Sequence, residues 1–166
     1  MAFICVPLSA QSYWQQFVDY KMDIHMQVEK FQYDGKMEVT YSNNSDDTLD
    51  KIYFHLYYNA FQPGSLMDER LKSIEDPDRR MTNNVGTKDN PIYESRISKL
   101  TPEEIGFVKM NSIHQNGKLL DFKYMGTILE VSLKEPLGPK SSTTLKLDWK
   151  TQVPKIIRRG GRDSSE

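Results

Sequence analysis

Cysteine, net charge and long apolar runs are what this sequence most clearly lacks. Its single cysteine, Cys5, excludes a disulfide framework and a dithiol redox motif. With 22 basic and 23 acidic residues the net charge is -1, so no excess of charge indicates nucleic acid or an anionic membrane surface as a partner. No apolar run is long enough for a transmembrane span. Aromatic residues at 11%, with only 8 Pro and 9 Gly in 166 residues, favour one globular domain over a disordered chain.

Histidine is also scarce, and this bears on catalysis. The three histidines, His25, His55 and His114, each stand alone on a predicted strand or turn. A hydrolytic zinc site needs converging imidazoles and a carboxylate, often as H-E-x-x-H on a helix, and that spacing does not occur. The sequence also has no nucleophile elbow, Walker loop or dinucleotide fingerprint. It therefore predicts no catalytic residue and no metal ligand in this chain.

The two ends of the chain differ from the rest. Residues 1–11 are apolar and end in the small residues Leu8-Ser9-Ala10, which is typical of the cleavage end of a secretory signal. We interpret them as a truncated signal-peptide remnant, which predicts export to the periplasm or secretion; a loosely packed arm is the alternative. Residues 155–166 carry an arginine and glycine cluster that we interpret as a basic linker or an incomplete final segment, rather than a carboxylate-binding loop. The arginines concerned are Arg158, Arg159 and Arg162.

Alternating apolar and polar residues dominate the part between the ends. The densest apolar and aromatic run, residues 52–61, predicts a central strand covered on both faces. Upstream, residues 22–28 alternate as a half-buried strand with one wet face, and Asp34-Gly35 predicts the turn of a β-hairpin.

The second half of the sequence repeats the strand signals. Asn116-Gly117 is the strongest short hairpin signal in the chain, with strands predicted on both sides of it. Residues 129–133 and 143–153 alternate again. Roughly eight short strands predict an all-β fold over residues 12–154, either an antiparallel β-sandwich or a curved, saddle-like pair of sheets.

A long connection, residues 62–104, interrupts the strand pattern. It contains one short helix signal, in which Ser65 precedes Asp68 as an N-cap and apolar residues recur at helical spacing. A connection of this length is either functional or an insertion that folds over the surface of the domain.

Four segments together resemble a known domain. They are Y-F-H-L-Y-Y-N-A-F-Q at residues 53–62, Q-N-G-K at 115–118, T-I-L-E-V-S-L at 127–133 and T-L-K-L-D-W-K-T at 144–151. Together they resemble the N-terminal β domain of the aminopeptidase N-like (gluzincin) family of zinc metallopeptidases. One departure is Thr151, where family members often carry glycine.

The resemblance implies a function for the parent protein rather than for this chain. In that family the β domain packs on a thermolysin-like catalytic domain and helps close its peptide cleft. The zinc ligands and the G-x-M-E-N motif belong to that following domain, and neither is present here, so no catalytic residue is carried over. The resemblance implies that this chain itself binds no cofactor, that its partner is a catalytic domain containing zinc, and that it meets peptide substrate only through the parent peptidase.

Two other functions stay open at this point. The chain could be a free-standing β-sandwich module for carbohydrate binding or adhesion, or a binding domain that acts on a separate peptidase. A docking domain should expose a contiguous apolar patch, whereas an independent module should not. We expect such a patch where the strand pattern gives way to the long connection, with Phe61, Leu66, Leu71 and Ile74 as the contact residues.

Overall fold

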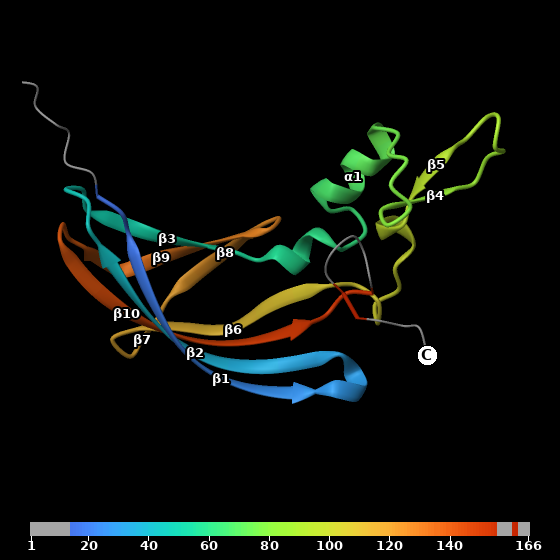
Figure 1. The fold of residues 1–166 in the computed structure, drawn as a ribbon. Helices are drawn as coiled ribbons and strands as arrows, with labels where there is room; N and C mark the ends of the chain where they lie inside the picture. The colour runs from blue at the N-terminus through green and yellow to red at the C-terminus, as the bar shows by residue number, and fades with distance from the viewer. Residues whose placement is uncertain (1–13, 156–160, 163–166) are drawn as a thin grey trace, which may run out of the picture.

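A computed structural model describes residues 14–155 and 161–162 of the chain as two facing antiparallel sheets with a small outlying unit (Figure 1). The larger sheet contains, in spatial order, β1 (Phe17–Gln27), β2 (Gln32–Asn43), β10 (Ser141–Gln152), β6 (Phe107–Gln115) and β7 (Lys118–Leu119). The smaller sheet contains β3 (Leu49–His55), β9 (Ile128–Leu137) and β8 (Asp121–Met125). The predicted all-β, sandwich-like fold is therefore confirmed. None of the described helices is long and apolar enough to cross a membrane.

The main core lies between the two sheets. Along β10, Leu145, Leu147 and Trp149 point inward and are buried, whereas Lys146 between them is exposed. The same alternation on the other strands builds one continuous cluster of buried side chains. Its members are Val39, Ile52, Leu56, Met110, Ile113, Leu120, Leu129, Val131, Leu145, Leu147 and Trp149. Each large side chain in this cluster stabilises the fold by about 1.5–3 kcal/mol.

The turn of the first hairpin lies earlier than the Asp34-Gly35 pair predicts. The chain reverses through the short 3-10 turn η1 (Val28–Lys30) and through Phe31, which has a left-handed φ of 52°. Gly35 lies inside β2, directly opposite Trp149 of β10. A Cβ atom on Gly35 would lie 2.3 Å from the indole Cζ2 of Trp149. The glycine is therefore needed for clearance beneath an aromatic ring and not for a turn.

The aromatic run at residues 52–61 also differs from its prediction. The strand ends at His55, and a 3-10 turn, η2 (Tyr57–Ala60), follows. β3 lies at the edge of the three-stranded sheet, and its inward-facing Ile52 is buried, as is Leu56 just after the strand. Tyr53 is 56% exposed. The prediction of a central strand buried on both faces is wrong, because no described element packs on the outer face of β3.

The second hairpin is confirmed, and it connects the two sheets. Asn116 and Gly117 have φ angles of 50° and 79°, as a tight turn between paired strands requires. The return strand then breaks at Leu120, which is buried. The two residues before this break pair with β6 in the larger sheet, and those after it pair with β9 in the smaller one. The chain therefore passes from one sheet to the other at the buried Leu120.

The long connection folds as a small unit beside one end of the sheets (Figure 1). It contains α1 (Leu66–Ser73), the short hairpin of β4 (Thr82–Asn84) and β5 (Tyr93–Ser95), and the 3-10 turn η3 (Ile97–Lys99). Its core is formed by Leu71, Met81 and Ile97. The predicted N-cap is confirmed, since the Ser65 side chain accepts a hydrogen bond from the Asp68 amide.

A buried carboxylate, that of Asp68, ties this unit together. It accepts hydrogen bonds from the Ser95 hydroxyl at 2.6 Å and the Gly64 amide at 2.8 Å, and the Lys72 ammonium lies 2.9 Å away. Burial by itself raises the pKa of Asp68, but these hydrogen bonds and the lysine outweigh it and lower the pKa below its usual 3.8. Asp68 therefore stays ionised and holds α1 to β5.

We expect Gly35→Ala to lower the free energy of unfolding by about 1–3 kcal/mol, because the new methyl group overlaps the buried Trp149 ring. Lys36→Ala, the exposed neighbour on the same strand, should stay within about 0.5 kcal/mol of the wild type. Denaturant midpoints measure both variants. Equal midpoints for the two would contradict the packing of the indole against Gly35.

The Asp68 carboxylate should make part of the stability depend on pH. Because its folded-state pKa is lowered, its contribution is complete above the usual pKa of 3.8 and is lost as the pH falls through the folded-state value. Asp68→Asn should lower the free energy of unfolding at neutral pH by about 1–3 kcal/mol and flatten the acid limb of the stability curve. Glu69→Gln, exposed on the same helix, serves as the control. Parallel acid limbs for Asp68→Asn and the wild type would refute the role given to Asp68.

Candidate functional site

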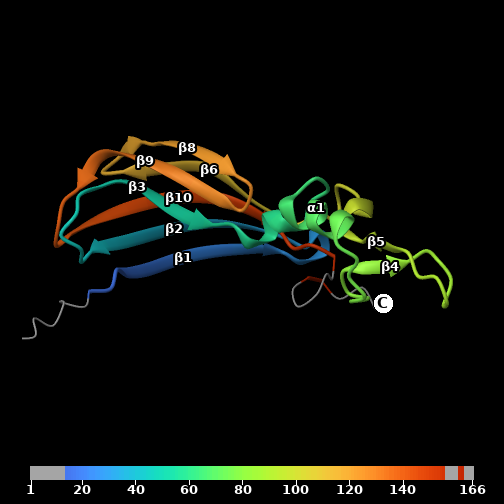
Figure 2. The ribbon, with the colours of Figure 1, turned by 90° about the horizontal axis from the view of Figure 1, so that it is seen from above.

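The smaller sheet leaves part of the larger one uncovered. In the register of the β1–β2 hairpin, Tyr20 lies opposite the fully buried Val39, and Met22 and Ile24 follow on the same inner face. These side chains and Met26 are nevertheless between 46% and 66% exposed. Figure 2 shows β1 at the open side of the structure, away from β3, β8 and β9. The prediction of one buried face for this strand is wrong, because no described element covers it.

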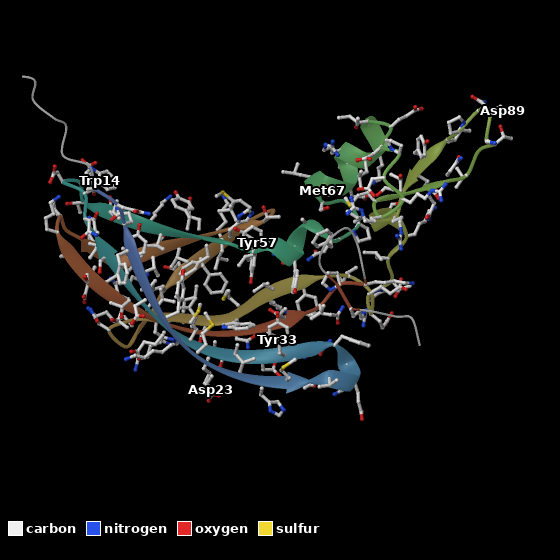
Figure 3. The ribbon with its side chains drawn as sticks, in the orientation of Figure 1. Trp14, Asp23, Tyr33, Tyr57, Met67 and Asp89 are labelled. Carbon is white, nitrogen blue, oxygen red and sulfur yellow. The ribbon has the colours of Figure 1, made fainter. Side chains whose placement is uncertain are left out.

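The uncovered region forms a groove of about 730 Å³ between the two sheets. Its floor comes from β2, β10 and β6 of the larger sheet, and β1 forms one wall. The end of β3 and the turn η2 form the other wall. Tyr33 and Tyr57 lie on opposite sides of this space (Figure 3). The lining residues are Tyr20, Met22, Ile24, Tyr33, Met37, Tyr53, Phe54, His55, Leu56, Tyr57, Tyr58, Val108, Met110, Trp149 and Thr151.

Aromatic side chains dominate the groove. The ring of Tyr33 meets that of Trp149 edge to face, with centroids 5.6 Å apart. Burial, followed by interaction with Tyr58, raises the pKa of Tyr33 to about 12, so its hydroxyl stays neutral. On the opposite wall the rings of His55 and Tyr57 lie 4.0 Å apart. The groove is therefore an apolar, ring-lined surface without a fixed charge on its floor.

The floor contains one unsatisfied polar group. The indole Nε1 of Trp149 is buried and has no hydrogen-bond partner among the described residues. A buried donor left without an acceptor costs about 1–3 kcal/mol. Because this atom is buried, the donor belongs to the packed core beneath the groove and not to its open surface.

The η2 wall is fixed to the larger sheet by hydrogen bonds. The Asn59 side chain accepts from the Val108 amide at 2.7 Å, and the Gly106 amide donates to the Phe61 carbonyl at 3.1 Å. On the other side, the Leu56 amide donates to the Thr127 carbonyl of the smaller sheet. The aromatic run thus bridges both sheets, and for this reason it turns at Tyr57 instead of continuing as a strand.

The four contact residues predicted from sequence do not form one surface. Leu66 and Ile74 are 84% and 52% exposed on and beside α1. Leu71 is 1% exposed, and it is a core residue of the small unit because the inner face of α1 packs on β5. Phe61 packs partly against the same core. None of the four lines the groove. Sequence reasoning missed the groove because the alternation on β1 predicts a buried face.

The histidines lie apart. His25 is exposed on the outer face of β1, His55 ends β3, and His114 lies on β6. Within the residues that the structure describes, no three His, Cys, Asp or Glu side chains group as a metal site. The described residues therefore do not fit a bound zinc ion.

The predicted terminal segments lie mostly outside the described residues. This applies to residues 1–11 with Cys5, and to Arg158 and Arg159. Arg162 is described: its guanidinium lies over the Phe31 ring at 4.5 Å and donates to the Glu103 carbonyl. Arg162 thus packs on the domain.

Comparison with known proteins gives structural neighbours only. No protein-family model and no curated protein sequence matches the chain. Among solved structures, it is similar to the M1 zinc metallopeptidase from Deinococcus radiodurans at 12% identity and a TM-score of 0.45, over 82% of this chain and 20% of that chain. A two-domain M1 zinc metallopeptidase mutant bound to L-tryptophan gives the same identity and TM-score over 21% of its length. The chain thus spans about a fifth of these proteins, and similarity at this level does not establish a shared activity.

We expect the groove to bind an apolar fluorescent dye and Ile24→Glu to reduce the bound dye by more than half, because it places a charge in the wall. The stability should change by no more than about 0.5 kcal/mol, since Ile24 is already half exposed. His25→Glu, on the opposite face of the same strand, is the matched control and should leave the dye signal unchanged. Equal losses in both variants would place the dye elsewhere.

Proposed function

We propose that this chain is the non-catalytic N-terminal β domain of an exported, aminopeptidase N-like zinc metallopeptidase. In this proposal it packs on the catalytic domain of the parent protein and helps close the peptide cleft, and that domain supplies the zinc. The resemblance of the four sequence segments supports the family. The chain itself performs no bond cleavage, and its contribution is a shaped apolar surface.

The uncovered groove is the observation that carries the proposal. Apolar surface left exposed on a folded domain often marks a site that a partner covers. Here a row of half-exposed side chains on β1 borders a groove of about 730 Å³ lined by tyrosine and tryptophan. A neighbouring domain of the same parent would cover this surface.

Two of the four segments that carry the resemblance, residues 53–62 and 144–151, contribute to the groove. Residues 53–58 form its η2 wall, and Trp149 with Thr151 lies on its floor. Large, rigid aromatic side chains supply much of the binding energy at protein interfaces and lose little conformational entropy on burial. Residues 53–58 and Trp149 would therefore anchor the interface between domains, which gives a physical reason why the resemblance centres on them.

A free-standing carbohydrate module is the second candidate, and one observation favours it. Tyr53 and Tyr57 are 56% and 69% exposed at the rim of the groove, where a sugar ring could stack on them. The apolar row on β1 argues the other way, because it would stay open to water in such a module. Glycan binding that is lost in Tyr57→Ala but kept in Ile24→Glu would favour the module over the docking domain.

For activity, we expect the isolated chain with added zinc to show neither tight zinc binding by calorimetry nor turnover of aminoacyl reporter substrates. The reason is the scattered placement of His25, His55 and His114. Stoichiometric zinc together with turnover that is lost in His55→Ala would overturn this expectation.

The parent protein provides the decisive test. Its coding sequence after Glu166 should contain an in-frame H-E-x-x-H motif. In that full-length protein, Ile24→Glu should lower both the melting temperature and kcat/KM, because the two domains separate more easily, while His25→Glu should lower neither. A downstream sequence without a zinc motif would reject the proposed family.

A further inference from the structure

The outer edge of β1 is long and unprotected. The strand has eleven residues, and its pairing with β2 runs without a bulge from Phe17, opposite Ser42, to Gln27, opposite Gln32. Within the described part of the chain nothing pairs with its other edge, which runs along the border of the sheet in Figures 1 and 2. Natural edge strands are often protected by a proline, a bulge, an inward-pointing charge or charged side chains such as lysine. Of these, β1 has only charged side chains on its outer face, Asp19, Lys21 and Asp23.

We propose that β1 pairs with β1 of a second copy of this chain, antiparallel and in register about a twofold axis at Met22. Such an interface is isologous, so each residue before Met22 faces the residue equally far after it on the other copy. A second copy fits this edge because, in the register that pairs all eleven residues, β1 is complementary in charge to itself.

The outer face of the strand shows the complementarity. With Met22 opposite Met22, Lys21 faces Asp23 of the second copy, and Asp19 faces His25. The twofold axis repeats both pairs, so no two like charges oppose each other. Directly opposed unlike charges stabilise antiparallel strands, whereas like charges destabilise them. Shifting the strands by two residues in one direction would place Lys21 opposite Lys21, and in the other direction it would place Asp23 opposite Asp23. Both shifts therefore bring like charges together.

The inner face matches in the same register. Tyr20 faces Ile24 of the second copy, and Val18 faces Met26. Apolar and aromatic cross-strand pairs of this kind stabilise a sheet. The apolar rows of the two copies then lie side by side. Each copy covers part of the apolar surface that β1 of the other copy exposes. The half-exposed state of the β1 side chains in the single chain fits this arrangement.

The same charges also face β2 within one chain. Lys21 lies opposite Glu38, and Asp23 lies opposite Lys36. The charged side chains of β1 are thus matched to those of β2. The same side chains can also face a strand that pairs with the free edge of β1. An experiment must therefore separate the contact between copies from the contact within the hairpin.

The inference is independent of the proposed peptidase family, because pairing uses the edge of the sheet whereas domain docking uses its inner face.

Analytical ultracentrifugation of the full chain over a range of concentrations gives the test. The wild type should show a monomer–dimer equilibrium. Lys21→Asp and Asp23→Lys should each weaken the dimer about tenfold, because each turns both symmetric contacts into like-charge pairs. An equimolar mixture of the two variants should restore the dimer as a heterodimer, since every facing pair is again of opposite charge. The double variant with both changes should dimerise like the wild type.

Glu38→Lys is the matched control. It creates a like-charge pair with Lys21 inside the hairpin but leaves the free edge unchanged, so its dimer should be as strong as that of the wild type. A monomeric wild type at all concentrations would overturn the proposal. A dimer that the single variants do not weaken, or that their mixture does not restore, would also overturn it and would indicate association through the groove or with another partner.

Discussion

The Trp149 indole packs directly over the bare backbone of Gly35, its partner on the neighbouring strand of the larger sheet. An aromatic side chain can lie this close to a neighbouring strand only where that strand has no Cβ, and β2 supplies the gap directly opposite the ring. The indole then reaches toward Tyr33 and forms the floor of the groove. Core packing and the candidate interface therefore share one residue pair, and its burial leaves the Nε1 donor of Trp149 without an acceptor.

Unequal sheet sizes explain where the open surface lies. Three strands cannot cover five, and the smaller sheet is centred over β10 and β6 because the chain enters it from β6 at Leu120. The strand left over is β1, at the far edge. Its inner face supplies the apolar wall of the groove and its outer edge supplies unpaired backbone groups. Both proposed interfaces thus involve β1, the one with a neighbouring domain through its inner face and the one with a second copy through its free edge.

Local sequence patterns allowed part of the fold to be predicted. The Asn116-Gly117 turn, the Ser65 cap and the alternation along β9 and β10 depend on neighbouring residues, and the structure has them where the sequence indicates. The turn predicted at Asp34-Gly35 is wrong because a glycine that gives clearance to a distant tryptophan looks the same in sequence as a glycine in a turn. Leu71, expected on a contact surface, lies instead in the core of the small unit, since helical spacing identifies an apolar face but not the element that covers it.

By itself, then, the sequence determined the strand-rich class, the antiparallel hairpins and the separate long connection, because these depend on residue periodicity and turn chemistry within a few positions. Only the tertiary structure decided which apolar faces are buried. On β1, Tyr20, Met22 and Ile24 alternate just as Leu145, Leu147 and Trp149 do on β10, yet the first set is half exposed and the second is core. The physical reason is that burial depends on what packs against a strand, and that is set by the order of strands in the sheets and by residues distant in sequence.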